Sequence, residues 1–167
     1  TNTIIYDYNM NERRPPASMT KIMTMLLIME AIDNGRINLD DEVVISENAS
    51  NMGGSQIFLE KNSKMKVEEL LKGIAIASGN DAAVAMAEYI AGSTDEFVNM
   101  MNEKVKSLGL KDTNFENVHG LDSENHYSTA YDMSQIAREL LNHDKILEYT
   151  SLYEEYLKKP DGTKTWL

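Results

Sequence analysis

The sequence predicts a mostly helical (mostly α) domain that opens with a single strand. Six apolar segments, most of them bounded by helix-capping or helix-stopping residues, are typical of helices. Only two short stretches rich in β-branched and aromatic residues are typical of strands. With 167 residues, the chain is long enough for one domain with a hydrophobic core.

The first half of the chain combines both predicted strands with the most apolar helix. The run Ile4-Ile5-Tyr6 is strand-like, and Gly35 favours the end of a helix whose interior is almost all Ile, Met, Leu and Ala. The predicted elements are a strand at 3–8, a turn at 9–14, a helix at 18–34, a short strand within 41–46 and a loop at 48–55. A lone N-terminal strand cannot satisfy its backbone hydrogen bonds, so we expect most of the sheet to come from outside this chain.

The second half is predicted to consist of helices joined by polar loops. Asp81 is expected to cap one helix, Ser93 and Glu96 form a capping box for the next, and Ser128-Thr129 opens another. The predicted helices span 67–77, 81–90, 94–108, 128–141 and 145–157, and Pro160-Asp161-Gly162 indicates a turn. Helices therefore account for most of the chain after residue 66.

Composition and charge exclude several classes of function. A net charge of −11 leaves no basic stripe that could neutralise nucleic-acid phosphates or hold this segment to an anionic membrane. There is no cysteine, which excludes disulfides and thiolate chemistry. His119, His126 and His143 show no metal-binding spacing, so we expect neither a metal nor a cofactor. No apolar run is long enough to span a membrane.

Ser18 and Lys21 form the most informative pair in the sequence. They stand three residues apart at the start of the apolar helix, so they share a face and the serine hydroxyl can meet the amine. Burial against an apolar helix lowers the pKa of a lysine, and the neutral amine can then take a proton from the serine. The helix N-terminus favours the negative charge that develops on Ser18. The pair is therefore a candidate for nucleophilic catalysis without a histidine.

The Ser-x-x-Lys pattern is weak on its own, because the chain contains a second copy at Ser63 and Lys66. That copy lies in a polar stretch with no apolar helix behind it, where serine is typical of turns and helix caps. Only the copy at Ser18 has a setting that can desolvate the lysine.

Ser78-Gly79-Asn80 forms a short polar link between two apolar helices. One interpretation is structural, with a helix stop followed by a helix cap. The other is functional, because a polar link between buried segments needs hydrogen-bond partners or a catalytic task. In that interpretation the Ser78 hydroxyl shuttles a proton beside Lys21, and the Asn80 amide orients Lys21 and a substrate carbonyl. Position alone leaves both interpretations open.

Taken together, these motifs resemble the serine D-alanyl-D-alanine carboxypeptidases of peptidase family S11, which are low-molecular-mass penicillin-binding proteins. Each motif is unspecific alone, but their combination and order along essentially the whole chain are specific. The resemblance is carried by residues 13–24, 52–55, 70–83, 87–93, 101–102, 108–109, 119–122 and 128–133.

The resemblance implies a fold in which this chain is incomplete. The chain would be the helical portion of the β-lactamase/DD-peptidase-like α+β fold, with most of the sheet missing. Residues 1–167 would then be an incomplete catalytic domain whose C-terminal part is absent. The family carries a Lys-Thr-Gly triad on a strand that lines the site, and here only Lys164-Thr165-Trp166 comes near that pattern. An indole in place of the glycine would block the close approach of substrate, so we expect the triad to follow Leu167.

The resemblance also implies a reaction. Ser18 would attack the peptide carbonyl between the two terminal D-alanines of a peptidoglycan stem peptide, with Lys21 as its base. Ser78 would relay the proton to the leaving amine, Asn80 would bind substrate, and water would hydrolyse the acyl-enzyme. A β-lactam would acylate Ser18 and leave slowly. Without the triad and its strand's oxyanion-hole donor, worth about 10²–10³ in rate, the chain is expected to be inactive or weakly active alone.

Localisation and partners follow from the same resemblance. The protein is expected to work outside the cytoplasm, in a bacterial cell envelope or periplasm, and to be anchored to the membrane in its full-length form. An apolar face left open by the missing sheet is a candidate interface for a homodimer.

Two alternatives remain. A class A-like β-lactamase would need a Glu-x-x-Leu-Asn loop, and Glu139-Leu140-Leu141-Asn142 is one residue short of that spacing. A non-catalytic helical module would carry Ser18 and Lys21 without using them. A stable β-lactam adduct on Ser18 would indicate the peptidase, fast turnover the lactamase, and no reaction the non-catalytic module.

Overall fold

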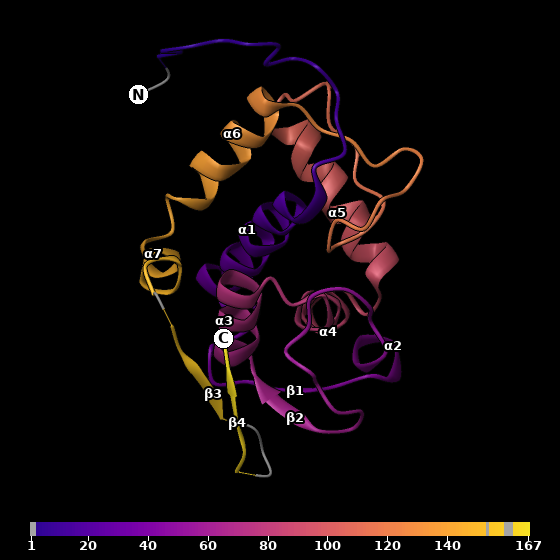
Figure 1. Cartoon of the computed structure of the whole chain (residues 1–167), viewed down its shortest axis with the longest axis vertical. Helices are drawn as coiled ribbons and strands as arrows, with labels where there is room; N and C mark the ends of the chain where they lie inside the picture. Colours follow the sequence, from indigo (N-terminus) through magenta and orange to yellow (C-terminus); the bar gives the residue numbers. More distant parts are fainter. Residues whose placement is uncertain (1–2, 153, 159–161) are drawn as a thin grey trace.

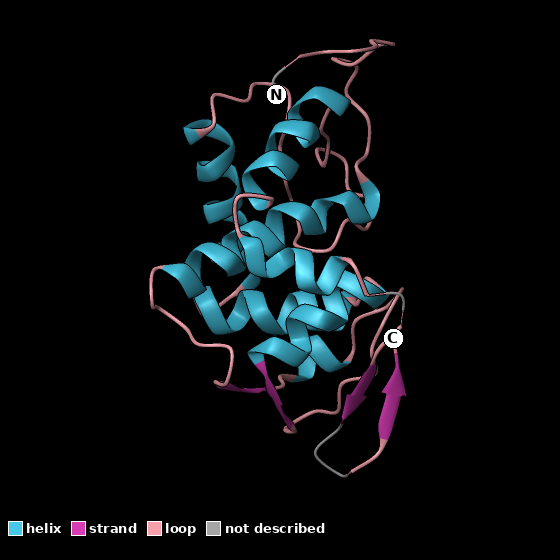
Figure 2. Ribbon diagram, turned by 90° about the vertical axis from the view of Figure 1, so that its left-hand side faces the viewer, coloured by secondary structure: helices cyan, strands magenta, loops and turns pink. Residues whose placement is uncertain are grey.

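The computed structural model describes residues 3–152, 154–158 and 162–167 of the chain. Helices form the body, and two small two-stranded antiparallel sheets lie at its lower end (Figures 1 and 2). The predicted mostly helical class is therefore confirmed. The elements are η1 (Ala17–Met19), α1 (Thr20–Asp33), β1 (Glu42–Val44), α2 (Glu47–Ser50), β2 (Lys64–Lys66), α3 (Val67–Ala77), α4 (Asn80–Ala91), α5 (Thr94–Ser107), α6 (Ala130–Leu140), α7 (Asp144–Thr150), β3 (Tyr156–Lys158) and β4 (Lys164–Trp166).

Helix α1 forms the centre of the body because its side chains are mostly apolar all the way round. Ten of its fourteen residues are buried. A helix without a polar face has to be surrounded by other elements, and α1 contacts α3, α4, α5 and α6 (Figure 1). The helix that begins just after Ser18 is therefore held on several sides.

The predicted helices before residue 142 are confirmed, several of them at their predicted ends. Helix α3 has the predicted bounds, and α5 begins after Ser93, whose Oγ accepts the Glu96 N–H at 3.1 Å. Helix α6 begins after Thr129, whose Oγ1 accepts the Asp132 N–H at 3.0 Å. These starts depend on hydrogen bonds between residues three apart, so the local sequence is enough to predict them.

The predicted N-terminal strand is not formed. Residues 3–8 belong to no strand and run across the top of the molecule in Figure 1. Ile5 and Tyr6 are 96% and 81% exposed. The reason is the lack of a neighbour, because in the described part of the chain no strand lies beside this segment to accept its hydrogen bonds.

The last predicted helix, 145–157, is too long. Helix α7 ends at Thr150, and Tyr156–Lys158 pairs instead with Lys164–Trp166 in the β3–β4 hairpin. Pairing with a later segment and burial of Leu157 override the local pattern. Most of the turn predicted at 160–162 lies outside the described residues.

Three further details differ from the predictions. A single helical turn, α2, and strand β2 occupy stretches predicted as polar loop and turn. Strand β2 forms because Met65 pairs with Val43 of β1 and both side chains are buried. Asp81 does not cap α4, because Gly79 is the N-cap and Asp81 lies inside the first turn.

Candidate active site

Ser18 is presented on a fixed and strained turn. It lies exposed in η1, and the preceding Ala17 has a φ of +48°, which is unusual for a residue other than glycine. Further upstream, the backbones of Arg14 and Ser128 exchange two hydrogen bonds of 2.8 and 2.9 Å. Such strained positions cluster at functional sites, and here the strain stands directly before the candidate nucleophile.

Lys21 meets Ser18 from the first turn of α1. Its Nζ donates a hydrogen bond to Ser18 Oγ at 3.3 Å and a second one to the His119 carbonyl at 2.7 Å. The Lys21 residue is only 2% exposed, and this burial lowers the pKa of its amine from 10.5 to about 8. A substantial fraction of the amine is therefore neutral near pH 8 and can accept the serine proton.

The second Ser-x-x-Lys copy has the opposite environment. Ser63 Oγ donates to the Glu60 carbonyl at 2.6 Å, as in a turn. Lys66 is exposed and pairs with Asp40 at 2.7 Å, and the hydrogen bond to that carboxylate raises the pKa of Lys66. The same spacing thus gives a solvated ion pair in one place and a desolvated amine in the other.

Two threonines of α1 belong to the site but were not predicted. Thr24 Oγ1 donates to the Val118 carbonyl at 2.7 Å, and Thr20 Oγ1 lies 2.7 Å from His126 Nε2. Together with Lys21, they bind the α1 start to the loop between α5 and α6. The available signal was a group of three polar residues at spacings of one, three and four within an otherwise apolar helix.

The same loop touches the backbone of the serine turn at Gly120. A Cβ on this residue would lie 1.9 Å from the Ala17 carbonyl oxygen and 3.0 Å from Ser18 N, and its φ is +95°. Only glycine allows both the conformation and this close approach. The neighbouring His119 is kept neutral, because burial and the Lys21 charge lower its pKa to about 4.

Ser78 stands at the end of α3 with a φ of +55°, and neither it nor Asn80 is joined to Lys21 by a hydrogen bond within the described residues. The Ser78 hydroxyl has no protein partner there and is open to solvent. Asn80 Nδ2 donates to the Gly53 carbonyl at 2.8 Å, which leaves the second N–H of Nδ2 and the Oδ1 atom to offer to a ligand. A Cβ at Gly54 would lie 2.6 Å from that Nδ2, so a glycine is required beside the amide.

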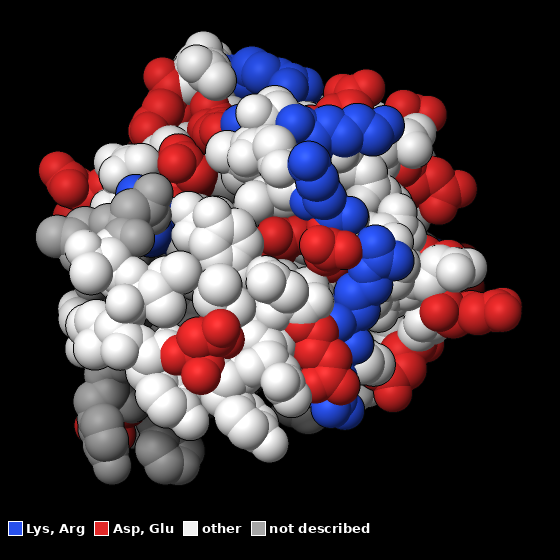
Figure 3. All heavy atoms as spheres, turned by 90° about the horizontal axis from the view of Figure 1, so that it is seen from above, with Lys and Arg blue, Asp and Glu red and all other residues white. Residues whose placement is uncertain are grey.

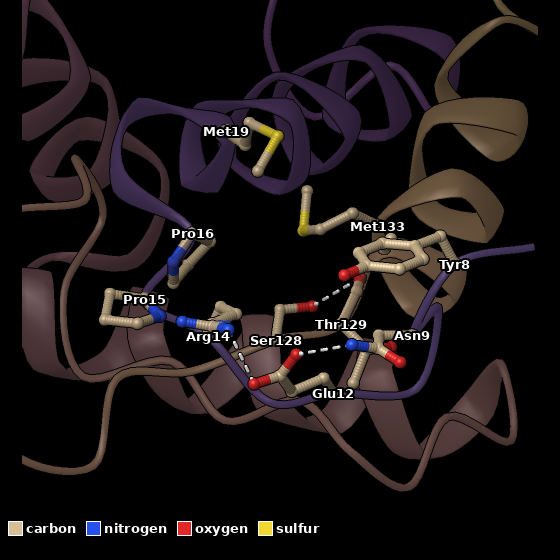
Figure 4. Close-up of a pocket in the computed structure, with 11 residues that line it drawn as sticks. Tyr8, Asn9, Glu12, Arg14, Pro15, Pro16, Met19, Ser128, Thr129 and Met133 are labelled. Atoms are coloured by element: carbon tan, nitrogen blue, oxygen red, sulfur yellow. Dashed lines mark hydrogen bonds and ion pairs between the residues drawn. The ribbon is translucent and has the colours of Figure 1, made fainter.

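A pocket of about 350 Å³ adjoins η1 on the side of α6 (Figure 4). Met19 and Met133 approach each other across it, and the Glu12–Arg14 ion pair of 2.6 Å lies on its polar side. Ser18, Lys21 and Ser78 are not among its lining residues. The serine–lysine pair therefore lies outside this pocket.

The described residues offer neither a metal site nor a membrane-spanning helix. These residues contain no group of three or more His, Cys, Asp or Glu side chains placed to hold a metal ion. None of the described helices has the length and apolarity needed to cross a bilayer. The face seen in Figure 3 carries a narrow band of Lys and Arg bordered by Asp and Glu, so this face is not uniformly basic.

An accessible serine beside a buried lysine of lowered pKa, at the start of the central helix, defines a class: acyl-transfer enzymes in which lysine assists the serine nucleophile. The family model of the D-alanyl-D-alanine carboxypeptidases, peptidase S11, matches residues 1–166. The chain therefore belongs to peptidase family S11.

Individual relatives agree in sequence and structure. The chain is 59% identical over 167 residues to the D-alanyl-D-alanine carboxypeptidase DacF of Bacillus subtilis, covering 100% of this chain and 43% of that protein. It matches the crystal structure of DacD from Francisella tularensis with a TM-score of 0.94 and 36% identity, over 99% of this chain and 40% of that one. For the crystal structure of penicillin binding protein 5 from Haemophilus influenzae, the TM-score is 0.90 at 36% identity. That match covers 98% of this chain and 48% of the other. The chain thus spans less than half the length of these relatives.

Proposed function

We propose that this chain contributes the nucleophile to a serine D-alanyl-D-alanine carboxypeptidase, with Ser18 as nucleophile and Lys21 as its base. The observation that supports this most directly is the 3.3 Å contact between Ser18 Oγ and an amine whose pKa burial lowers to about 8. No carboxylate or imidazole is needed to take the serine proton, because the desolvated amine is itself a base near that pH.

The reaction has two stages. Ser18 Oγ attacks the peptide carbonyl between the terminal D-alanines of a stem peptide while its proton moves to Lys21 Nζ. The tetrahedral intermediate collapses, the C–N bond breaks, and the terminal D-alanine leaves after its amine gains a proton. Water then attacks the ester on Ser18, which releases the shortened peptide and restores the hydroxyl.

We assign the proton relay to Ser78 and a substrate contact to Asn80. Among the described residues, the Ser78 hydroxyl has no hydrogen-bond partner to give up before it serves a leaving amine. The Gly53 carbonyl occupies one N–H of Asn80 Nδ2, so the second N–H can donate to a substrate carbonyl and Oδ1 can accept from the Lys21 ammonium.

The β-lactamase alternative is less well supported. His143, which follows Glu139-Leu140-Leu141-Asn142, lies 2.6 Å from Asp33, the last residue of α1. Ser18 precedes the first residue of that helix, which at 1.5 Å per residue is about 21 Å long. Glu139 is therefore near the wrong end of α1 to activate a water at Ser18. Lys164–Trp166 is similarly remote, at the lower end of the molecule in Figure 1.

The wider setting is part of the proposal. Peptidoglycan stem peptides and β-lactams are the proposed ligands, and residues 1–167 are the proposed helical part of a larger catalytic domain. The proposed location is outside the cytoplasm, with a membrane anchor in the full-length protein. A homodimer through the exposed, sheet-facing surface is also proposed. Ile5 and Tyr6 of the N-terminal segment are exposed, and no strand lies beside them among the described residues.

Mass spectrometry after a long incubation with benzylpenicillin tests the function. We expect slow formation of one stable adduct, on Ser18, that disappears in Ser18→Ala and persists in Ser63→Ala, the matched variant of the second motif. Fast turnover without an adduct would favour the lactamase, and no adduct after prolonged incubation would favour the non-catalytic module. Labelling as fast as that of a full-length relative would contradict the need for the missing part.

A further inference from the structure

The loop between α5 and α6 is closed on itself by a buried histidine. His126 is 2% exposed, and its Nδ1 lies 2.9 Å from the backbone N of Glu116, ten residues earlier. The ring also packs against Phe115, with 5.7 Å between ring centroids. A backbone N–H can only donate, so Nδ1 is the acceptor and the neutral ring carries its proton on Nε2.

The other ring nitrogen joins this closure to the catalytic turn. His126 Nε2 lies 2.7 Å from Thr20 Oγ1, so the Nε2–H donates to the threonine. Thr20 is fully buried and stands between Ser18 and Lys21 in the chain. The His126 side chain thus contacts both the Glu116 end of the loop and the first turn of α1.

The loop held in this way determines where the lysine amine lies. Lys21 Nζ donates to the His119 carbonyl at 2.7 Å, and the next contact along the loop is that of Val118 with Thr24. Between its ends the loop has no freedom to shift toward α1, because Gly120 is already in close contact with Ala17. If the hydrogen bond between the Glu116 N–H and His126 were lost, the His119 carbonyl could move away from the Lys21 amine.

We propose that His126, as the neutral Nε2–H tautomer, is a positioning residue for Lys21. By holding residues 116–126 against Thr20, it fixes the carbonyl that keeps the amine buried beside Ser18. The catalytic meaning of this role rests on the proposed function, whereas the positioning itself can be measured without any reaction.

Protonation of the His126 ring would remove the hydrogen bond that Nδ1 accepts from the Glu116 N–H. The carboxylates that face His126 are Glu116 and Asp122 of its own loop, and both favour the imidazolium. His119 also lies close enough to interact with the His126 ring. From α1, only the uncharged Thr20 hydroxyl faces the ring among the described residues. Burial outweighs the two carboxylates and lowers the pKa of His126 below its usual 6.5. A proton on Nδ1 would point at the Glu116 N–H, so two donors would oppose each other. At His126 the folded state binds fewer protons than the unfolded state, because the pKa of the ring is lower when it is buried. The contribution of His126 to the free energy of unfolding is therefore greatest above about pH 6.5 and falls as the pH drops toward the pKa of the folded state.

Two substitutions of His126 distinguish the effect of its two hydrogen bonds from the effect of its titration. In His126→Gln, the amide can donate to Thr20 and accept from Glu116, but it cannot titrate. In His126→Leu, a side chain of similar size offers neither bond. The control is Thr24→Val, which removes a different loop contact of α1 and leaves the histidine closure intact.

The main measurement is the NMR titration of the Lys21 side chain in the 167-residue chain. We expect its pKa to stay near 8 in the wild type and His126→Gln and to move up toward 10.5 in a folded His126→Leu. A folded His126→Leu that keeps the pKa near 8 would overturn the proposal. A shift of the Lys21 pKa toward 10.5 in His126→Gln would also overturn the proposal. This second result tests the proposal even if His126→Leu does not fold.

Two further readouts distinguish positioning from reaction. Nitrogen NMR of the wild type should show His126 as the Nε2–H tautomer at pH 7, and the Nδ1–H tautomer would refute the geometry. Acylation by a fluorescent penicillin should be about 10- to 100-fold slower in His126→Leu and within about twofold of the wild type in His126→Gln. If no form is acylated while the Lys21 titrations follow the expected pattern, the proposed function fails and the positioning role stands.

Discussion

At the scale of single residues, burial gives the lysines of two identical motifs opposite pKa shifts. Lys21 and Lys66 both follow a serine by three positions, yet the pKa of Lys21 is lowered and that of Lys66 is raised. The first amine faces a helix interior and a backbone carbonyl, whereas the second faces solvent and a carboxylate. Desolvation, not sequence spacing, therefore distinguishes the proposed base Lys21 from Lys66.

The lowered pKa of Lys21 predicts the pH dependence of acylation. The neutral amine is the reactive form, so the rate should rise with pH and level off above a midpoint of about 8. For a pKa near 8 the neutral fraction grows about tenfold between pH 7 and pH 9. The measurement is the rate of penicillin labelling over this range, with Lys21→Arg as the variant that stays charged. A rate independent of pH would show that Lys21 is not the base.

Gly120 gives a second prediction at this scale. Gly120→Ala should destabilise the fold and slow Ser18 acylation, because its Cβ would collide with the Ala17 carbonyl. The matched control is Gly109→Ala, where φ is +71° but no atom lies within 4 Å of the new Cβ. We expect that control to lose about 1–2 kcal/mol from the left-handed backbone alone. Equal losses in thermal denaturation of the two variants would contradict a contact at the serine turn.

At the scale of elements, one carboxylate connects helix α4 to the segment before β2. Asp81 accepts hydrogen bonds from the backbones of Ile57 and Leu59 at 3.0–3.1 Å, and from Ala82 at 2.9 Å. All three donors are buried, so Asp81 satisfies two N–H groups of the 57–59 segment and one N–H group in the first turn of α4. The neighbouring Asn80 is held by Gly53 and by the Ser55 carbonyl, so the same junction orients the second candidate motif.

Removal of this connection should be costly. Asp81→Ala leaves two buried N–H groups of the 57–59 segment without a partner, for an expected loss of about 2–4 kcal/mol in unfolding free energy. Asp81→Asn keeps one carbonyl oxygen and should lose less. Urea denaturation followed by circular dichroism measures both. An alanine variant as stable as the wild type would mean that the segment does not depend on Asp81.

At the scale of the whole molecule, the open N-terminal segment predicts self-association. Ile5 is 96% exposed, in a segment that has no strand beside it in the part of the chain that the structure describes. Sedimentation should show a dimer that salt strengthens, since the net charge of −11 makes the copies repel each other. Ile5→Lys should weaken it more than Leu141→Lys, which adds the same charge at another exposed apolar residue. A strict monomer at all concentrations would rule the interface out.

The sequence predicted those features that depend on neighbours a few residues apart. The Ser93 and Thr129 caps and the bounds of α3 belong to this group. Contacts such as Thr20 with His126, 106 residues apart, and Asp81 with Leu59 could not be predicted, because nothing local marks the partner. The helix predicted at 145–157 failed for the same reason, since its second half pairs with residues 164–166.

The titration of the Lys21 amine by NMR tests the central claim most directly, because it requires no substrate and no other part of the protein. We predict a midpoint near pH 8 in the 167-residue chain, as expected for an amine buried beside Ser18 and the His119 carbonyl. A midpoint at or above the ordinary lysine value of 10.5 would mean that the amine stays charged and would contradict its role as the base for Ser18.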